Sequence, residues 1–427
     1  MKNLFYLFYL LAITVNAQMA VLETAILEPA SPESVGMSID RLGKIDKMLS
    51  SAVDKGDIPG VVALIARDGK IVFHKAYGHA NTPDKKALDT DAIFRIASQT
   101  KAITATAVMI LWEEGKFQLD DPISKYIPEF ENTGVLDTFN EADSTFTTKP
   151  TDKAITIRHL LTHTSGIGYG MIDGDDRFRK IYQKAGIIDA FTTKDVAIGD
   201  NIKKLATLPL HANPGEKWIY SEGLDVLGYL VEVVSGMPFD QFLRARIFDP
   251  LGMDDTWFYL PQTMAGRLVT VQQKTDGKWV GFESAIFDPD YPVKGAKRFF
   301  SGGGGLSSTA ADYARFLQMY LNKGTYNGHR ILSRTTVRSV MANQIGDLWA
   351  GGGKDYGLAF SVLNAKGEAM GGQGSEGTFD WGGYFNTQYF ADPQEEIIGI
   401  LMKQTQGTTN DQTGWKFRAM VFTAVDD

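Results

Sequence analysis

Cysteine is absent from the 427 residues of this chain. Its absence excludes disulfide bonds, thiol nucleophiles, thiolate metal sites and any lipid anchor built on a cysteine. Basic runs are missing too, because no five consecutive positions are all Lys or Arg, and the formal net charge is −8. The charge therefore gives no reason to expect nucleic acid as a partner.

Long apolar runs are scarce, and the one with targeting character lies at the N-terminus. Lys2 supplies a positive start, Leu4–Val15 supply an apolar stretch, and small residues follow around Ala17. This order is typical of a cleaved signal peptide over residues 1–17. The stretch is too short to span a hydrocarbon layer of about 30 Å comfortably. We therefore expect residues 18–427 to be periplasmic or secreted, with no stable membrane insertion.

Several catalytic and cofactor motifs are also missing. No Gly-x-Ser-x-Gly occurs, which argues against a Ser-His-Asp hydrolase of the α/β kind. His159 and His163 have the spacing of two metal ligands, but no His-Glu-x-x-His pattern or third ligand accompanies them, so capping or core hydrogen bonding is the better account. The glycine run 302–305 lacks the Lys-Ser/Thr of a phosphate loop. We expect no metal and no cofactor.

The hydrophobic pattern predicts an α+β fold, in which an antiparallel sheet flanked by helices is built from both chain ends. A helix beginning at Ile39 precedes β-rich stretches at 61–65 and 71–73, joined by the hairpin sequence Asp68-Gly69. Strands at 383–390 and 397–402 form a second hairpin before a helix over 415–425.

Helical stretches prevail between these two sheet regions, at 102–114, 157–161, 224–235 and 239–247. We expect one hydrolase domain over 18–427, with a sheet lobe of about 35–100 and 290–427. A mostly helical lobe of about 101–289 is inserted into it.

The sequence Ser98-Gln99-Thr100-Lys101 opens one of the predicted helices. Residues three apart share a helix face, so Ser98 Oγ and Lys101 Nζ can meet. A serine needs an adjacent base to become a nucleophile, and a desolvated lysine can serve as that base. The motif alone is weak, because an N-cap serine followed by a solvated lysine gives the same four letters.

Two later segments supply partners for this pair. Tyr220 stands on a loop just before a helical run, where its hydroxyl could pass a proton between the serine and a leaving group. We expect Gly382 and Gly383 to enter a strand, where the missing side chains let a ligand approach the backbone. A free N–H there, together with that of Ser98, would make a two-donor oxyanion hole. A core tyrosine and an ordinary glycine-rich turn are the alternatives.

In order and spacing these motifs resemble the serine β-lactamase/penicillin-binding-protein superfamily, and most closely the class C β-lactamase-like proteins and family VIII carboxylesterases. The resemblance implies Ser98, Lys101 and Tyr220 as catalytic residues and Tyr384 as the second oxyanion donor through its N–H. It extends over about residues 35–425. The flanking strings that carry it are Phe94–Ala97, Leu119–Tyr126, Thr156–Gly166 and Gly304–Thr309.

Departures from the family pattern bear on the substrate. Glu222 stands where penicillin-recognising members have the Asn of Tyr-x-Asn, and Trp381-Gly382-Gly383 replaces their Lys-Thr-Gly. Losing that lysine removes a cation for a substrate carboxylate, whereas Trp381 offers an apolar wall. We therefore expect hydrolysis of a small-molecule ester, with Trp381, Gly382, Gly383 and Glu222 at the substrate. The alternatives are a D-amino-acid peptidase, amidase or weak β-lactamase acting on cell-wall-related amides, and a non-catalytic receptor.

Overall fold

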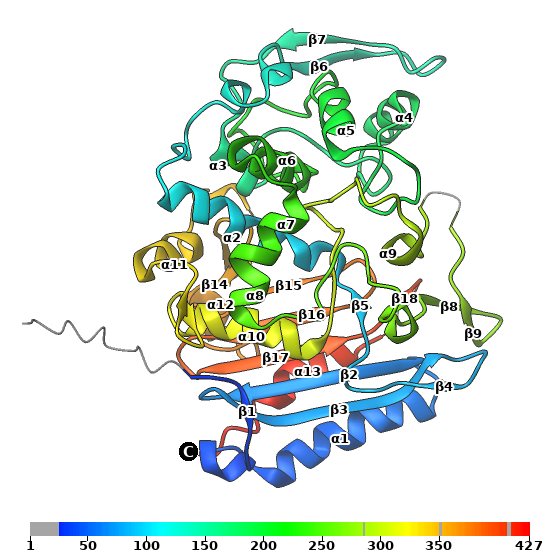
Figure 1. Ribbon diagram of the computed structural model, residues 1–427, viewed down its shortest axis with the longest axis vertical. Helices are drawn as coiled ribbons and strands as arrows, with labels where there is room; N and C mark the ends of the chain where they lie inside the picture. Colours follow the sequence, from blue (N-terminus) through cyan, green and yellow to red (C-terminus); the bar gives the residue numbers. More distant parts are fainter. Residues whose placement is uncertain (1–24, 285–286, 350–351, 408–410) are drawn as a thin grey trace, which may run out of the picture.

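The computed structural model describes residues 25–284, 287–349, 352–407 and 411–427, and its centre is one nine-stranded sheet (Figure 1). The proposed signal peptide lies outside the described residues. Eight strands follow one another across the sheet and β4 (Lys86–Ala87) adds to β3. Their order is β1 (Glu28–Pro29), β3 (Lys70–Asn81), β2 (Gly60–Arg67), β17 (Ile397–Met402), β16 (Gln388–Asp392), β15 (Phe379–Gly382), β14 (Ser361–Leu363) and β13 (Lys354–Tyr356).

The two ends of the chain meet in the middle of this sheet, as predicted. Strand β17 pairs antiparallel with β2, from Arg67 opposite Ile397 to Val62 opposite Met402. All the pairs of the sheet are antiparallel except β1 with β3, which is parallel. The predicted α+β class with a sheet from both chain ends is confirmed.

Helices cover both faces of the sheet. Every residue of β2 is buried, and its side chains alternate between two cores. Helices α1 and α13 pack together on the side of Val61 and Ile65, whereas α10 packs on the side of Val62 and Leu64 (Figure 1). The longer helices are α1 (Ile39–Asp54), α2 (Thr100–Glu113), α4 (Asp176–Ala185), α5 (Ile198–Leu205), α6 (Gly223–Ser235), α10 (Ala310–Leu321), α11 (Arg334–Met341) and α13 (Thr413–Phe422).

Two of the shorter elements lie in or after the second part of the sheet, and the others fill the region between its two parts. Small separate sheets lie within it, and the predicted helix at 239–247 turns into a π-helix before it ends. The short helices are α3 (Ile157–Leu161), α7 (Phe239–Leu243), η5 (Arg244–Phe248), α8 (Asp249–Leu251), α9 (Tyr291–Lys294) and α12 (Ala365–Ala369). The short strands are β5 (Phe94–Arg95), β6 (Gly134–Phe139), β7 (Phe146–Pro150), β8 (Gln272–Thr275), β9 (Lys278–Gly281), β10 (Ser307–Ser308), β11 (Thr325–Tyr326), β12 (His329–Arg330) and β18 (Thr405–Gln406).

The predicted strand at 383–390 was wrong in its first half. Strand β15 ends at Gly382, and residues 383–387 form a tight turn before β16 begins at Gln388. Gly383 N–H donates to Thr387 O at 2.8 Å, and Asn386 takes a left-handed φ of 68°, a conformation that Asn tolerates better than most residues. The paired glycines therefore close a strand instead of entering one.

No helix among the described residues is both long and apolar enough to cross a membrane. The division into a sheet lobe and a helical lobe stays a prediction.

Candidate active site

Ser98 lies in a 3-10 turn, η2 (Ala97–Gln99), that leads into α2. The sequence placed it at the start of the α-helix itself, whereas in the structure the α-helix begins two residues later, at Thr100. Ala97, directly before it, has a φ of 44°, a left-handed conformation that costs a non-glycine residue about 1–2 kcal/mol. Backbone strain of this kind clusters at functional sites.

Lys101 lies fully buried beneath Ser98, with 1% of its surface exposed. Its Nζ is 3.2 Å from Ser98 Oγ, 2.9 Å from Tyr169 Oη and 2.6 Å from the carbonyl oxygen of Gly303. A buried ammonium or amine must have its polar hydrogens accepted, and these three contacts meet that need. Burial raises the pKa of Tyr169 well above its usual range, so this phenol keeps its proton.

Tyr220 completes the cluster from the loop before α6. Its hydroxyl donates to Ser98 Oγ at 2.6 Å, and Lys101 Nζ lies 4.7 Å from its ring centroid. The ring of His163 lies 4.8 Å away, and burial lowers the pKa of His163 well below its usual range. The structure thus brings Lys101 Nζ and Tyr220 Oη within hydrogen-bonding distance of Ser98 Oγ.

A glycine-rich segment positions Lys101 from the opposite side. Asp225 on α6 accepts hydrogen bonds from Ser301 Oγ at 2.5 Å and from Gly303 N–H at 3.3 Å. A Cβ at Gly303 would lie 2.3 Å from the Asp225 carboxylate, so only glycine fits there. Burial raises the pKa of Asp225. The carbonyl that meets Lys101 is therefore held in place through Asp225.

A pocket of about 260 Å³ opens at Ser98. Apolar and aromatic side chains form most of its wall, and Phe191 has ring contacts to Phe287 at 5.4 Å and to Tyr384 at 6.2 Å. Tyr384 thus lies on the same pocket as Ser98, as the oxyanion prediction requires. The lining residues are Ser98, Tyr169, Met171, Ile172, Asp189, Ala190, Phe191, Tyr220, Phe287, Gly303, Gly304 and Tyr384.

Four predicted substrate-contacting residues are placed elsewhere. Of the described residues, Trp381, Gly382, Gly383 and Glu222 do not line this pocket. The Trp381 ring lies 5.9 Å from that of Tyr220, and Gly383 packs so closely that a Cβ would lie 2.4 Å from Ile96 O. Gly382 ends β15, and Glu222 is buried at the start of α6. Trp381, Gly382 and Gly383 line a separate cavity of about 480 Å³, and the contact of the four residues with a substrate stays a prediction.

The sequence reading missed Tyr169, Asp189 and Asp225. Each belongs to a segment whose path is set by tertiary packing. Tyr169 stands three residues beyond the Thr156–Gly166 string, and this closeness was the one signal that could have drawn attention to it.

The two histidines have structural roles. His159 forms a capping box with Thr156 at the start of α3, and His163 Nδ1 lies 2.9 Å from Ser221 Oγ. Among the described residues, no group of three His, Cys, Asp or Glu side chains could hold a metal ion.

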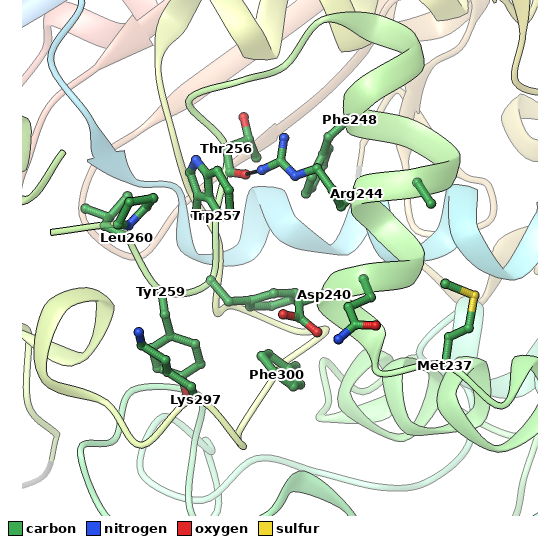
Figure 2. Close-up of a pocket in the computed structure, with 14 residues that line it drawn as sticks. Met237, Asp240, Arg244, Phe248, Thr256, Trp257, Tyr259, Leu260, Lys297 and Phe300 are labelled. Atoms are coloured by element: carbon green, nitrogen blue, oxygen red, sulfur yellow. Dashed lines mark hydrogen bonds between the residues drawn. The ribbon is translucent and has the colours of Figure 1, made fainter. Parts of the chain in front are cut away.

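A larger cavity, of about 550 Å³, lies between η5 and the segment 256–261 (Figure 2). The Arg244 guanidinium lies 4.0 Å from the Trp257 ring centroid and 5.1 Å from that of Phe248, and it donates to Thr256 O at 2.7 Å. Within the described part of the chain, this cavity contains no serine near a lysine or tyrosine. Size therefore does not identify the active site, and the smaller pocket at Ser98 is the candidate.

Known proteins resemble this chain along most of its length. Esterase EstB from Burkholderia gladioli is 30% identical over 400 residues, which cover 88% of this chain and 94% of EstB. Lovastatin esterase from Penicillium rubens is 28% identical over 383 residues, covering 83% and 91%. The solved structure of EstCE1, described as a hydrolase with promiscuous acyltransferase activity, has a TM-score of 0.76 and 27% identity, covering 90% of this chain and 99% of EstCE1.

The family assignment follows from the match to a whole-domain sequence pattern. The Beta-lactamase family model matches residues 45–421, a range that includes Ser98, Lys101, Tyr220 and Tyr384. With the sheet, the pocket and the relatives in agreement, the chain belongs to the Beta-lactamase family.

Proposed function

We propose that this chain is a serine hydrolase that cleaves small carboxylic esters through an acyl-enzyme on Ser98. The observation that carries the proposal is the meeting of Lys101 Nζ, at 3.2 Å, and Tyr220 Oη, at 2.6 Å, on Ser98 Oγ at the wall of an apolar pocket. The names of EstB and lovastatin esterase support an ester as the substrate.

Acylation uses Lys101 as the base in its neutral amine form. Gly303 O and Tyr169 Oη accept its two N–H groups, so the nitrogen lone pair is left for the Ser98 hydroxyl. Ser98 Oγ attacks the ester carbonyl carbon and its proton passes to Lys101. Tyr220 then donates its proton to the leaving alcohol and regains one from Lys101.

Deacylation runs the same proton path in reverse. Water attacks the acyl carbon, and its proton passes through Tyr220 to Lys101. Lys101 returns a proton to Ser98 Oγ as the carboxylic acid leaves. In both steps the backbone N–H groups of Ser98 and Tyr384 would donate hydrogen bonds to the oxyanion. In other hydrolases, removing one such donor raises the activation free energy by about 3–4 kcal/mol.

The central test is Ser98→Ala. In this variant kcat/KM for a short-chain p-nitrophenyl ester should fall by about a thousandfold or more, while the circular dichroism spectrum and Tm stay unchanged. Intact-mass measurement should show an acyl group on the wild type and none on the variant. We expect no acyl-enzyme to accumulate from nitrocefin or a D-Ala-D-Ala peptide. Retained ester turnover in the variant would refute the proposal.

We also propose that the protein acts outside the cytoplasm. The support is the order of Lys2, the apolar stretch 4–15 and the small residues near Ala17. Expression in a bacterial host followed by N-terminal sequencing should yield a mature chain that begins at Gln18 in the periplasmic or culture fraction. A chain that keeps Met1 and stays in the cytoplasmic fraction would contradict export.

A further inference from the structure

Asp189 is the charged side chain on the wall of the Ser98 pocket that the catalytic scheme does not use. It lies between α4 and α5, next to Ala190 and Phe191, which also line the pocket. Its Oδ2 accepts the Met171 N–H at 2.6 Å. A Cβ at Gly170 would lie 2.5 Å from its Oδ1, so the carboxylate is pressed against that backbone. Its position on the wall is therefore fixed.

A second carboxyl group lies directly behind it. Glu222 is 1% exposed, and its carboxyl group lies close enough to that of Asp189 for the two to interact and raise the pKa of Glu222. Asp189 Oδ1 and Glu222 Oε1 are both buried, and no N–H or hydroxyl group of the described residues donates to either oxygen. Two neighbouring carboxyl groups repel each other when both are ionised, so the more deeply buried one, Glu222, is the one held neutral.

Glu222 is the member of the pair that holds a proton. Burial raises the pKa of Glu222 well above its usual range, and the charges of Asp189 and Asp225 raise it further. Glu222 also anchors its own segment, because its N–H donates to Gly168 O at 3.1 Å. The result is a single fixed negative charge that a ligand in the pocket meets.

No cation on the described wall of the Ser98 pocket offsets this charge; Lys194 and Lys204 line an adjoining cavity that shares Asp189. Lys101 is 1% exposed, and its Nζ is enclosed by Ser98, Tyr169 and Gly303. Asp225 accepts hydrogen bonds from Ser301 Oγ and from the Gly303 N–H. Of the described lining residues, none is Lys or Arg, and most are apolar. A substrate carboxylate would therefore meet Asp189 without a counter-ion.

We propose that Asp189, which lies beside Glu222, is a specificity-determining residue that makes the Ser98 pocket accept esters with uncharged or cationic acyl groups and reject those with anionic ones. The inference rests on the proposed esterase function. Two like charges a few ångströms apart at a partly buried site repel strongly enough to change a rate constant by about tenfold or more. A protonated Glu222 makes the arrangement possible, since two ionised carboxylates in contact would push Asp189 from the wall.

The test compares three p-nitrophenyl esters of nearly equal acyl length: glutarate (anionic), glutaramate (neutral) and 5-aminovalerate (cationic). In the wild type, kcat/KM for the glutaramate ester should exceed that for the glutarate ester by about tenfold or more. In Asp189→Asn this ratio should fall about tenfold, because Asn can keep the Met171 contact and donate its amide to Glu222 while it lacks the charge. A ratio within an enzyme does not depend on its absolute activity.

Two further variants separate local charge from other effects. Glu222→Gln keeps a donor toward Asp189 and the charge of Asp189, so its ratio should match that of the wild type. Asp195→Asn removes an exposed carboxylate that pairs with Arg298 at 3.0 Å, and its ratio should also stay unchanged. A wild-type enzyme that turns over both esters equally, or an unchanged ratio in Asp189→Asn, would overturn the proposal.

If Asp189→Asn fails to fold, the wild-type ratio at low and high salt replaces it. The preference for the neutral ester should shrink as added salt screens the repulsion, and a preference that salt does not alter would refute a charge effect. Failure of the esterase function itself gives a different result, since none of the three esters would then acylate Ser98.

Discussion

The hydroxyl group of Tyr169 orients Lys101 for proton transfer from Ser98. It accepts one N–H of Lys101, and Gly303 O accepts another, so the lone pair of the neutral amine is left for Ser98. Without the phenol oxygen, the neutral amine would have one N–H without an acceptor, and this N–H would compete with the lone pair for Ser98 Oγ. Such a contact opposes deprotonation of the serine.

Tyr169→Phe should therefore lower kcat for a p-nitrophenyl ester by about tenfold to a hundredfold and change KM little. The rate at which a fluorophosphonate labels Ser98 should fall by a similar factor, and the acid limb of the pH profile should move. A purely structural role would lower Tm instead and leave the pH profile in place, which would count against this assignment.

Three site residues could be predicted from the sequence because their motifs carry the chemistry within a few positions. Ser98 and Lys101 are one helical turn apart, and Tyr220 directly precedes a helix with clear apolar periodicity. Asp189 and Asp225 gave no such signal. Their roles arise from contacts with Glu222 and Gly303, which depend on how distant segments pack.

At the scale of one element, the turn after β15 sets the distance between the sheet and Ser98. Gly383 lies so close to the segment before Ser98 that a Cβ would stand 2.4 Å from Ile96 O and 2.2 Å from Thr387 Oγ1. At its neighbour Gly382 the nearest atom, Thr387 O, would be 3.3 Å away. Alanine substitutions at these two adjacent glycines therefore make a matched pair of variants, one crowded and one not.

Gly383→Ala should destabilise the fold by about 1–3 kcal/mol, because the turn and the η2 backbone must separate. It should also lower kcat, since Tyr384 moves away with the turn. Gly382→Ala should change both quantities much less. Urea unfolding and ester kinetics on the two variants measure this, and equal effects at the two positions would contradict the assigned role of Gly383.

Elements whose turn residues mark them in the sequence were predicted well. Elements whose ends depend on strand pairing and on packing with distant residues were not. Asp68 and Gly69 both take left-handed φ values, 51° and 71°, as the hairpin sequence between β2 and β3 requires. The first strand of the late hairpin was placed too early because residues 383–387 are rich in aromatic and small residues that also suit a strand. The turn is fixed by Asn386 and by packing against Ile96, which periodicity does not reveal.

For the molecule as a whole, the buried Glu222 makes stability depend on pH. Its pKa is raised well above the ordinary value of 4.5, so the native state keeps a proton that the unfolded chain releases. The stability that this proton provides is fully present below pH 4.5 and is lost as pH rises through the folded pKa.

Glu222→Gln should flatten this dependence, because an amide has no proton to lose. The Tm of the variant relative to that of the wild type should rise steadily between pH 5 and pH 8. Thermal unfolding followed by circular dichroism at unit pH intervals gives the comparison. Parallel Tm curves for the two proteins would show that Glu222 is not the group responsible.

The pairing of β17 with β2 has a consequence for how the protein is made. Arg67 in β2 pairs with Ile397 in β17, so the middle of the sheet cannot form until the ribosome has synthesised most of the chain. Until then, the edge of β2 that will pair with β17 has no partner strand. Long-range pairing of this kind is slow, and an open strand edge invites association with other chains. The nascent protein therefore stays unfinished, and in need of protection, until its last strands emerge.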